Sequence, residues 1–99
     1  MEIEPIEITD NEFLRQFEAR IEGELAKIEY VEQERKMFMT RLVMSDNLKE
    51  KAYLNPFIKA VLDSVKKRNL TVMPTSPEIV KFFRANRLYK NMLPTGINI

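Results

Sequence analysis

The spacing of apolar residues changes once along this chain, and that change limits the folds that the chain can adopt. Up to about residue 45, apolar residues tend to alternate with polar ones, which is the pattern of half-buried β-strands. After residue 55 they recur at helical spacing, which is the pattern of helices with one buried face. Strands followed by helices predict an α+β, or mixed α/β, domain.

Three strands are expected in the first half of the chain. In residues 13–21 the odd positions are apolar except for Arg15, and Gly23 then marks a hairpin turn because glycine adopts positive φ without a steric penalty. The return strand covers residues 25–31, and a charged turn at 32–36 leads into a third strand at 37–44. The third strand is more continuously apolar, which predicts burial on both faces. Together these segments form an antiparallel meander.

The second half is expected to form helix-strand-helix. Asn55 is a candidate helix N-cap with Pro56 at the first helical position, and Ser76 and Pro77 repeat that arrangement for a second helix. The apolar stripes are Phe57, Ile58, Val61, Leu62 and Val65 in the first helix, and Ile79, Val80, Phe82 and Phe83 in the second. A short strand at residues 70–73 separates the helices. A helix that crosses between this strand and an earlier one implies one parallel strand pair.

The length and the two ends bound the organisation of the chain. The 99 residues predict one domain, because domains usually hold about 100–200 residues. Residues 1–10 form either an arm or an edge strand, and residues 90–99 form a loose tail or a short edge strand; an uncovered edge could pair in a homodimer. No apolar run approaches the roughly 20 residues of a membrane span. The acidic start lacks the features of a signal peptide, so we expect a cytoplasmic protein that does not enter the membrane.

The composition excludes several kinds of chemistry. The chain has no Cys and no His, which removes thiol nucleophiles, histidine bases and the commonest metal ligands, so no metal site is predicted. Residues 1–48 hold 12 acidic and 6 basic side chains, whereas residues 49–99 hold 3 acidic and 10 basic ones. The basic half could face a phosphorylated cofactor, or it could be an unevenly charged surface. It carries no groove-reading motif, so nucleic acid is not an expected partner.

The order of these elements and several local strings resemble the GNAT superfamily of acetyl-CoA-dependent N-acetyltransferases, in its short single-domain branch. That branch has a D-G-E-L-A hairpin, an R-G-x-G-x-G cofactor loop before a helix, and a strand that runs into V-x-P-x-C-P. The matching segments here are Glu22-Gly23-Glu24-Leu25-Ala26, residues 57–70, and Val72-Met73-Pro74-Thr75-Ser76-Pro77. The resemblance covers about residues 13–90 and implies a GNAT-like fold. It also implies acetyl-CoA as the cofactor and a small amine or a protein as the acceptor.

The chain departs from the family at the functional positions. The family's cofactor loop falls on residues 49–54, where all three glycines are missing; its Cys falls on Ser76 and a His on Arg41. Glycines let backbone N–H groups approach the cofactor pyrophosphate, and Glu50 adds both bulk and negative charge here. We therefore expect acetyl-CoA binding to be weak or absent and interpret the loop as a polar connection. If the cofactor does bind, the resemblance implies contacts from Val43, Met44, Lys49, Lys51 and Ala52.

Three side chains are candidates for the chemistry, and each has an ordinary structural alternative. Ser76 stands where the family has a reactive thiol, but it can equally cap the second helix. Tyr53 and Tyr89 could protonate a leaving thiolate, or they could pack against a helix. Glu18 and Glu29 could act as a general base or lie in solvent. Arg41 either pairs with Glu29 across the sheet or faces the cofactor cleft.

Two functions remain open from the sequence. One is an N-acetyltransferase, transferring an acyl group to an amine, with impaired cofactor binding. The alternative is a GNAT-fold protein that has lost catalysis and acts through contacts with other proteins. The resemblance supports the first function, and the altered loop argues for the second.

Overall fold

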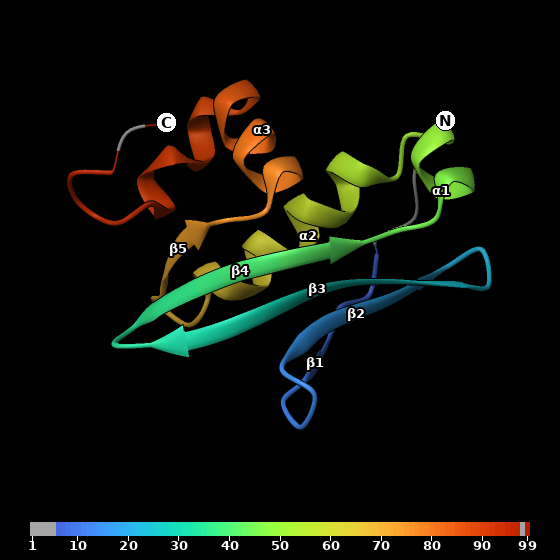
Figure 1. Ribbon diagram of the computed structural model, residues 1–99, viewed down its shortest axis with the longest axis horizontal. Coiled ribbons are helices and arrows are strands. Elements are labelled where there is room, and N and C mark those ends of the chain that lie inside the picture. The colour runs from blue at the N-terminus through green and yellow to red at the C-terminus, as the bar shows by residue number, and fades with distance from the viewer. Residues whose placement is uncertain (1–5, 98) are drawn as a thin grey trace.

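A five-stranded sheet and a layer of helices make up this protein (Figure 1). The structure is a computed structural model, and it describes residues 6–97 and 99. The strands are β1 (Thr9–Asn11), β2 (Gln16–Ile21), β3 (Glu24–Gln33), β4 (Lys36–Val43) and β5 (Thr71–Pro74). The helices are α1 (Asp46–Glu50), α2 (Leu54–Lys66), α3 (Pro77–Ala85) and the 3-10 helix η1 (Arg87–Met92).

The sheet order follows the chain order, from β1 to β5. The strands β1 to β4 pair antiparallel, and β5 pairs parallel with β4. The meander, the helix-strand-helix order and the single parallel pair are therefore confirmed. None of the helices formed by the described residues has the length and apolar character needed to span a bilayer.

One face of the sheet and one side of α2 form the hydrophobic core. Phe17, Ile28 and Leu42 are register partners on neighbouring strands, and all three are buried. The predicted stripe of α2 is fully buried as well and belongs to the same cluster. Burial of one face of an amphipathic helix against one face of a sheet is what makes these short elements stable together.

The alternation predicted for the first strand fails at its beginning. Residues 12–15 form a turn, and Phe13 is 94% exposed, whereas Phe17, Ala19 and Ile21 are buried as predicted.

The second hairpin is also tighter than predicted. The predicted five-residue turn is wrong, because Glu34 and Arg35 alone connect β3 to β4, with φ angles of 51° and 63°. Two central residues with positive φ match the right-handed twist of the flanking strands.

A β-bulge at Thr40 interrupts β4. Glu29 lies opposite Arg41 while Tyr30 lies opposite Met39, so Thr40 has no partner in the register. The extra residue shifts the phase of burial along the strand: Met39 is buried, the next two side chains are exposed, and Leu42 is buried. A bulge bends a strand and increases its twist. Only one face of β4 is therefore fully buried, and the prediction that both faces are buried is wrong.

The helix boundaries differ slightly from the predicted ones. Helix α2 begins at Leu54, within two residues of the predicted start, but its N-cap position is Tyr53 and Asn55 is already helical. The chain after α3 forms η1, and Met92 and Leu93 are buried. The expectation of a loose tail or edge strand is therefore wrong for residues 90–93, because these two apolar side chains join the core.

An ion pair joins β1 to the end of α2. Arg68 Nη2 lies 2.7 Å from Asp10 Oδ2, and the Tyr30 hydroxyl donates a hydrogen bond of 2.6 Å to Asp10 Oδ1. The Arg68 guanidinium also lies 5.7 Å from the centre of the Phe17 ring, which adds a cation–π contact. Burial, followed by the bond to Asp10, raises the pKa of Tyr30. These contacts hold the edge strand against the helix layer.

Candidate active site

The two parallel strands separate at one point, and this creates an open strand edge inside the fold. Their pairing runs from Lys36–Thr71 to Met39–Pro74. The backbone N–H groups of Thr75 and Ser76 then both donate to the Met39 carbonyl, at 3.1 and 3.2 Å. In the part of the chain that the structure describes, no strand pairs with that edge of β4 beyond Met39. We call this opening, between residues 40–43 and residues 75–76, the fork.

Ser76 lies at the base of the fork. It is 1% exposed and occupies the N-cap position of α3, as predicted. Its hydroxyl, however, donates to Glu78 Oε1 at 2.9 Å rather than capping a backbone N–H group. Thr75 Oγ1 donates to the Met39 carbonyl at 2.8 Å and reinforces the turn. The side chain at the position of the family's thiol is therefore fixed next to a carboxylate.

The segment between α1 and α2 keeps part of the geometry of a glycine loop. Helix α1, which the sequence did not predict, contains Lys49 and Glu50, and α2 begins at Leu54. Ala52 has φ +65°, a left-handed conformation that residues other than glycine adopt infrequently. This alanine stands at the second of the three missing glycines, so the backbone shape is retained there without the glycine itself.

Both lysines of this segment have carboxylate partners. Lys51 Nζ lies 2.7 Å from Glu22 Oε1 in the β2–β3 hairpin. Their hydrogen bond raises the pKa of Lys51 and lowers the pKa of Glu22. Lys49 Nζ lies 4.0 Å from Glu78 Oε2 at the start of α3. Both lysine charges are therefore already compensated in this structure.

The β2–β3 hairpin holds the α1 region through a second glutamate. Glu24 Oε2 accepts a hydrogen bond of 2.8 Å from Asn47 Nδ2, and this bond is the largest cause of the lowered pKa of Glu24. Gly23, between the two glutamates, has φ +79°, which a tight hairpin turn requires. The hairpin therefore places two carboxylates against the segment that follows β4.

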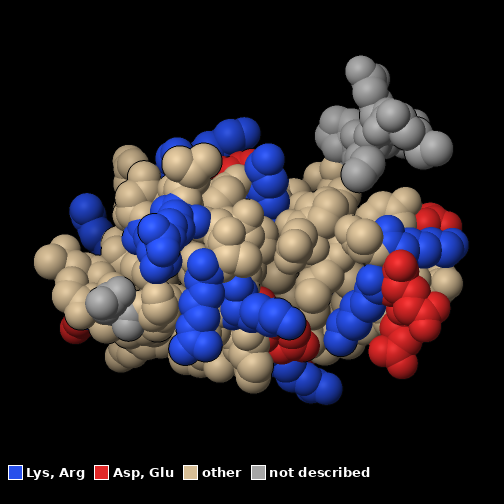
Figure 2. Space-filling view, turned by 90° about the horizontal axis from the view of Figure 1, so that it is seen from above, with Lys and Arg blue, Asp and Glu red and all other residues tan. Residues whose placement is uncertain are grey.

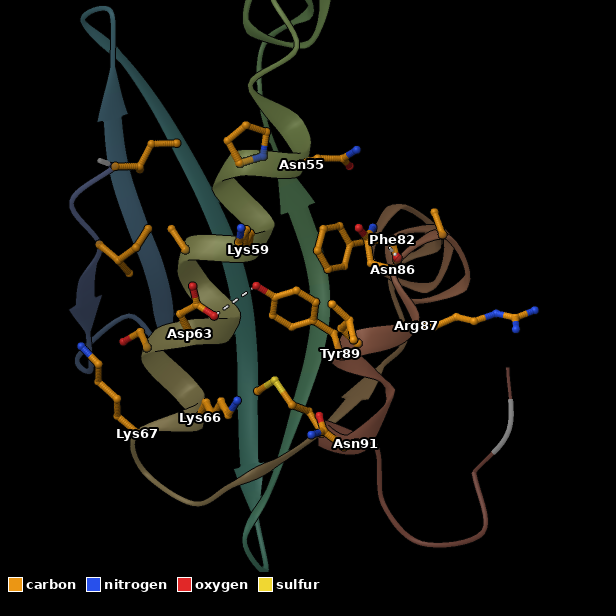
Figure 3. Close-up of a pocket in the computed structure, with 18 of the residues that line it drawn as sticks. Asn55, Lys59, Asp63, Lys66, Lys67, Phe82, Asn86, Arg87, Tyr89 and Asn91 are labelled. Carbon is orange, nitrogen blue, oxygen red and sulfur yellow. Dashed lines mark hydrogen bonds between the residues drawn. The ribbon is translucent and has the colours of Figure 1, made fainter. Parts of the chain in front are cut away.

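A groove of about 1330 Å³ lies between α2 and the α3–η1 segment (Figure 3). The Tyr89 hydroxyl reaches across it and donates to Asp63 Oδ1 on α2 at 3.2 Å. Burial, followed by the Asp63 charge, raises the pKa of Tyr89. Other lining residues are mostly basic or neutral, and the basic ones are Lys59, Lys66, Lys67, Arg84 and Arg87. On the face shown in Figure 2, Lys and Arg side chains occupy more of the surface than Asp and Glu.

The remaining candidates from the sequence lie apart from the fork or in its strand. Val43 ends β4, where it pairs with Lys27, and Met44 follows it and is buried. The Tyr53 hydroxyl hydrogen-bonds Glu22, which lowers the pKa of that carboxyl. Tyr53 and Tyr89 therefore each bind a carboxylate, one at the hairpin and one in the groove.

The strand carboxylates lie on the face of the sheet opposite the core. Glu29 Oε2 lies 3.7 Å from Arg41 and 3.2 Å from Lys27, which confirms the predicted cross-strand pair. Glu18 accepts a hydrogen bond from Asn11. These contacts satisfy both carboxylates outside the fork.

Comparison with known proteins identifies the family. A family model described as GCN5-related N-acetyl-transferase matches residues 16–92. The chain belongs to this family. It is also similar to the NMR structure of a GCN5-like protein from Staphylococcus aureus, with a TM-score of 0.70 and 18% sequence identity over 97% of this chain and 94% of that one. At this identity the likeness concerns the fold. No curated protein matches the chain.

Sequence reasoning missed the side chains that surround the family's cofactor loop. Glu22, Glu24 and Glu78 have no sequence signal beyond their charge, because their partners lie far away in the chain. The bulge, in contrast, has a readable signal. Met37, Met39, Leu42 and Met44 keep an alternating pattern that slips by one residue in the middle, as a bulge in a half-buried strand requires.

Proposed function

We propose that this protein transfers an acetyl group from acetyl-CoA to an amine, and that its altered loop weakens cofactor binding. The observation that supports this most directly is the fork. Among the described residues, no strand pairs with the edge of β4 beyond Met39, so this edge offers backbone donors and acceptors next to the start of α3. Family membership over residues 16–92 points to the same chemistry.

The cofactor-binding residues fit acetyl-CoA in part. Ala52 keeps the left-handed backbone conformation, and the first turn of α2 presents N–H groups that have no acceptor within the helix. Pro56 removes one of these donors, and the carboxylates of Glu22 and Glu78 compete with phosphate for the two lysines. We therefore expect Lys49 and Lys51 to hold the phosphates, with the backbone near Val43 and Met44 close to the acetyl group.

Acetyl-CoA and the protein contribute different parts of the proposed reaction. When bound, acetyl-CoA supplies an acetyl group activated as a thioester. We expect backbone N–H groups of the open β4 edge to stabilise negative charge on the acetyl oxygen. Among the catalytic candidates, Ser76 adjoins the fork, because its backbone N–H donates to the Met39 carbonyl at 3.2 Å. Tyr53 and Tyr89 are the alternative acids for the leaving group. The acceptor is a small amine or an amine on a protein.

Calorimetric titration with acetyl-CoA tests this proposal. We expect weak binding that decreases with salt, because contacts between point charges are screened, and that disappears in the double variant Lys49→Ala plus Lys51→Ala. The matched control is Arg35→Ala plus Lys36→Ala, which removes two charges at the β3–β4 turn. Tight binding that is indifferent to the first pair would show that the backbone holds the pyrophosphate without glycine.

The second candidate is a GNAT-fold protein without catalysis that acts through protein contacts. The pairing of Lys51 with Glu22 at 2.7 Å favours it, because a compensated lysine is a poor phosphate ligand. An absence of heat on titration, together with an absence of acetyl transfer to amines, would support this alternative over the transferase.

A further inference from the structure

The sheet has a second face, and none of the helices in the described part of the chain packs on it. All four helices contribute residues to the hydrophobic cluster that contains Met37 and Met39 of β4, so they lie on one side of the sheet. Figure 1 shows β3 and β4 in front of α2. Because successive side chains of a strand point to opposite faces, the neighbours of these two methionines point away from the core. We call this side of the sheet the outer face.

A row of three apolar side chains crosses the outer face. Val31 lies opposite Phe38 in the β3–β4 register, and Phe38 lies opposite Met73 in the β4–β5 register. Register partners on neighbouring strands share a face, so the three side chains form one patch. Val31 is 46% exposed, Phe38 and Met73 are partly exposed, and none of the three belongs to the core cluster. An apolar patch that lies outside the core favours contact with another protein surface.

Charges of both signs lie next to this row. Glu29 and Arg41 are register partners on the same face, and their side chains lie 3.7 Å apart. The Arg41 side chain is 68% exposed, and a guanidinium carries five N–H donors, so it has room for a further carboxylate. The other outward pairs of β3 and β4 are Lys27 with Val43 and Gln33 with Lys36. No register pair on this face of the two strands therefore joins two charges of the same sign.

We propose that the outer face binds a second copy of this chain, about a two-fold axis that runs along the strands between β3 and β4. Such an axis exchanges the two strands, so each residue faces the second copy of its own register partner. Glu29 of one copy then meets Arg41 of the other, and Val31 meets Phe38, each contact occurring twice. The residue pairs that are compatible within the hairpin are therefore compatible across the interface as well. Closed two-fold dimers are also the commonest symmetric assemblies.

The size of the outer face sets the expected strength of the dimer. The strands β2 to β5 cover about 450 Å² per copy, at a rise of about 3.3 Å per residue and a strand spacing of about 4.8 Å. Two copies together bury roughly 900–1,000 Å², which is near the lower limit of specific interfaces. We therefore expect a reversible dimer that forms at micromolar concentrations or above. This dimer uses side chains instead of the backbone of an edge strand, and it does not depend on the proposed acetyl transfer.

Sedimentation velocity of the whole chain, measured over a range of concentrations, tests the apolar row. Wild type should change from monomer to dimer as its concentration rises. Phe38→Thr should weaken the dimer by about tenfold or more, because the apolar contact is lost at two places in a symmetric dimer, whereas threonine still suits a strand. The matched control is Leu88→Thr, which changes a 91% exposed side chain on η1 and should leave the dimer unchanged. A wild type that stays monomeric up to millimolar concentration, or equal losses in the two variants, would overturn the proposal.

A mixing experiment tests the position of the axis. Arg41→Glu brings two carboxylates together at each Glu29–Arg41 contact, and Glu29→Arg brings two guanidinium groups together there. Each variant alone should therefore self-associate about tenfold more weakly than wild type, since the change counts twice. In an equimolar mixture every one of these contacts joins opposite charges, so a heterodimer should form with about the affinity of wild type. Thermal unfolding checks that both variants are folded. Self-association of the single variants at the wild-type level, or no recovery in the mixture, would contradict the proposed interface.

Discussion

Lys51 Nζ lies 2.7 Å from Glu22 Oε1, and this contact links the β2–β3 hairpin to the segment at the position of the family's cofactor loop. The two residues are 29 positions apart in the chain. The hairpin therefore does more than reverse the chain, because one of its carboxylates neutralises Lys51, which we propose as a phosphate ligand.

Removal of the Glu22 charge should strengthen binding of acetyl-CoA. In Glu22→Gln, Lys51 no longer has an anionic partner, so we expect a gain of about two- to fivefold in affinity, decreasing as salt is added. Calorimetry measures the change, with Glu32→Gln as the control for a loss of negative charge elsewhere. An affinity that stays the same would show that Lys51 does not contact the cofactor.

Substitution of Ala52 by glycine should stabilise the protein or leave it unchanged. A left-handed conformation costs a non-glycine residue about 1–2 kcal/mol, while glycine adds about 0.5–1 kcal/mol of unfolded-state entropy, so the net gain is about 0–1.5 kcal/mol. Ala60→Gly, in the middle of α2, is the matched control and should lose about 1 kcal/mol. Urea unfolding measures the free energy of unfolding of both variants and shows whether each substitution raises or lowers it. A similar loss in both variants would contradict the strain at Ala52.

Truncation of the α2 stripe should be costly. Leu62 is fully buried, so Leu62→Ala should lower the free energy of unfolding by about 2–5 kcal/mol. Lys59→Ala, on the exposed side of the same helix, should change it by less than about 0.5 kcal/mol. Chemical denaturation of the two variants gives the comparison, and a loss at Leu62 below half a kcal/mol would mean that the helix does not pack as described.

Alkaline pH should weaken the fold through Tyr30. Its pKa is raised in the folded state by burial and by Asp10, so the folded protein holds this proton more tightly than the unfolded chain. The corresponding stability is complete below the unfolded pKa of about 10 and is lost as pH rises above it. Tyr30→Phe should therefore flatten the loss of stability above pH ~10. Parallel curves for wild type and variant, measured by urea unfolding, would rule out this contribution.

The local elements could be predicted from the sequence because their signals are local. The alternation in β2, the turn at Gly23 and the stripe of α2 each depend on residues a few positions apart, and the structure confirms them. Helix α1 was not predicted because its five residues show no apolar periodicity. The N-cap of α2 is Tyr53 and not the predicted Asn55, because the turn that precedes the helix sets where the helix begins. The loose tail was wrong because Met92 and Leu93 find apolar partners that local pattern cannot show.

The sequence by itself therefore determined the order of strands and helices, the side of α2 that is buried and the departures from the family's cofactor loop. The tertiary structure alone decided what surrounds that loop. It placed Glu22 beside Lys51, Glu78 beside both Ser76 and Lys49, and the bulge at Thr40 where β4 leaves β5. The physical reason is distance along the chain: periodicity reports on neighbours in sequence, whereas a site is built from charges and strand edges that meet only after the chain has folded.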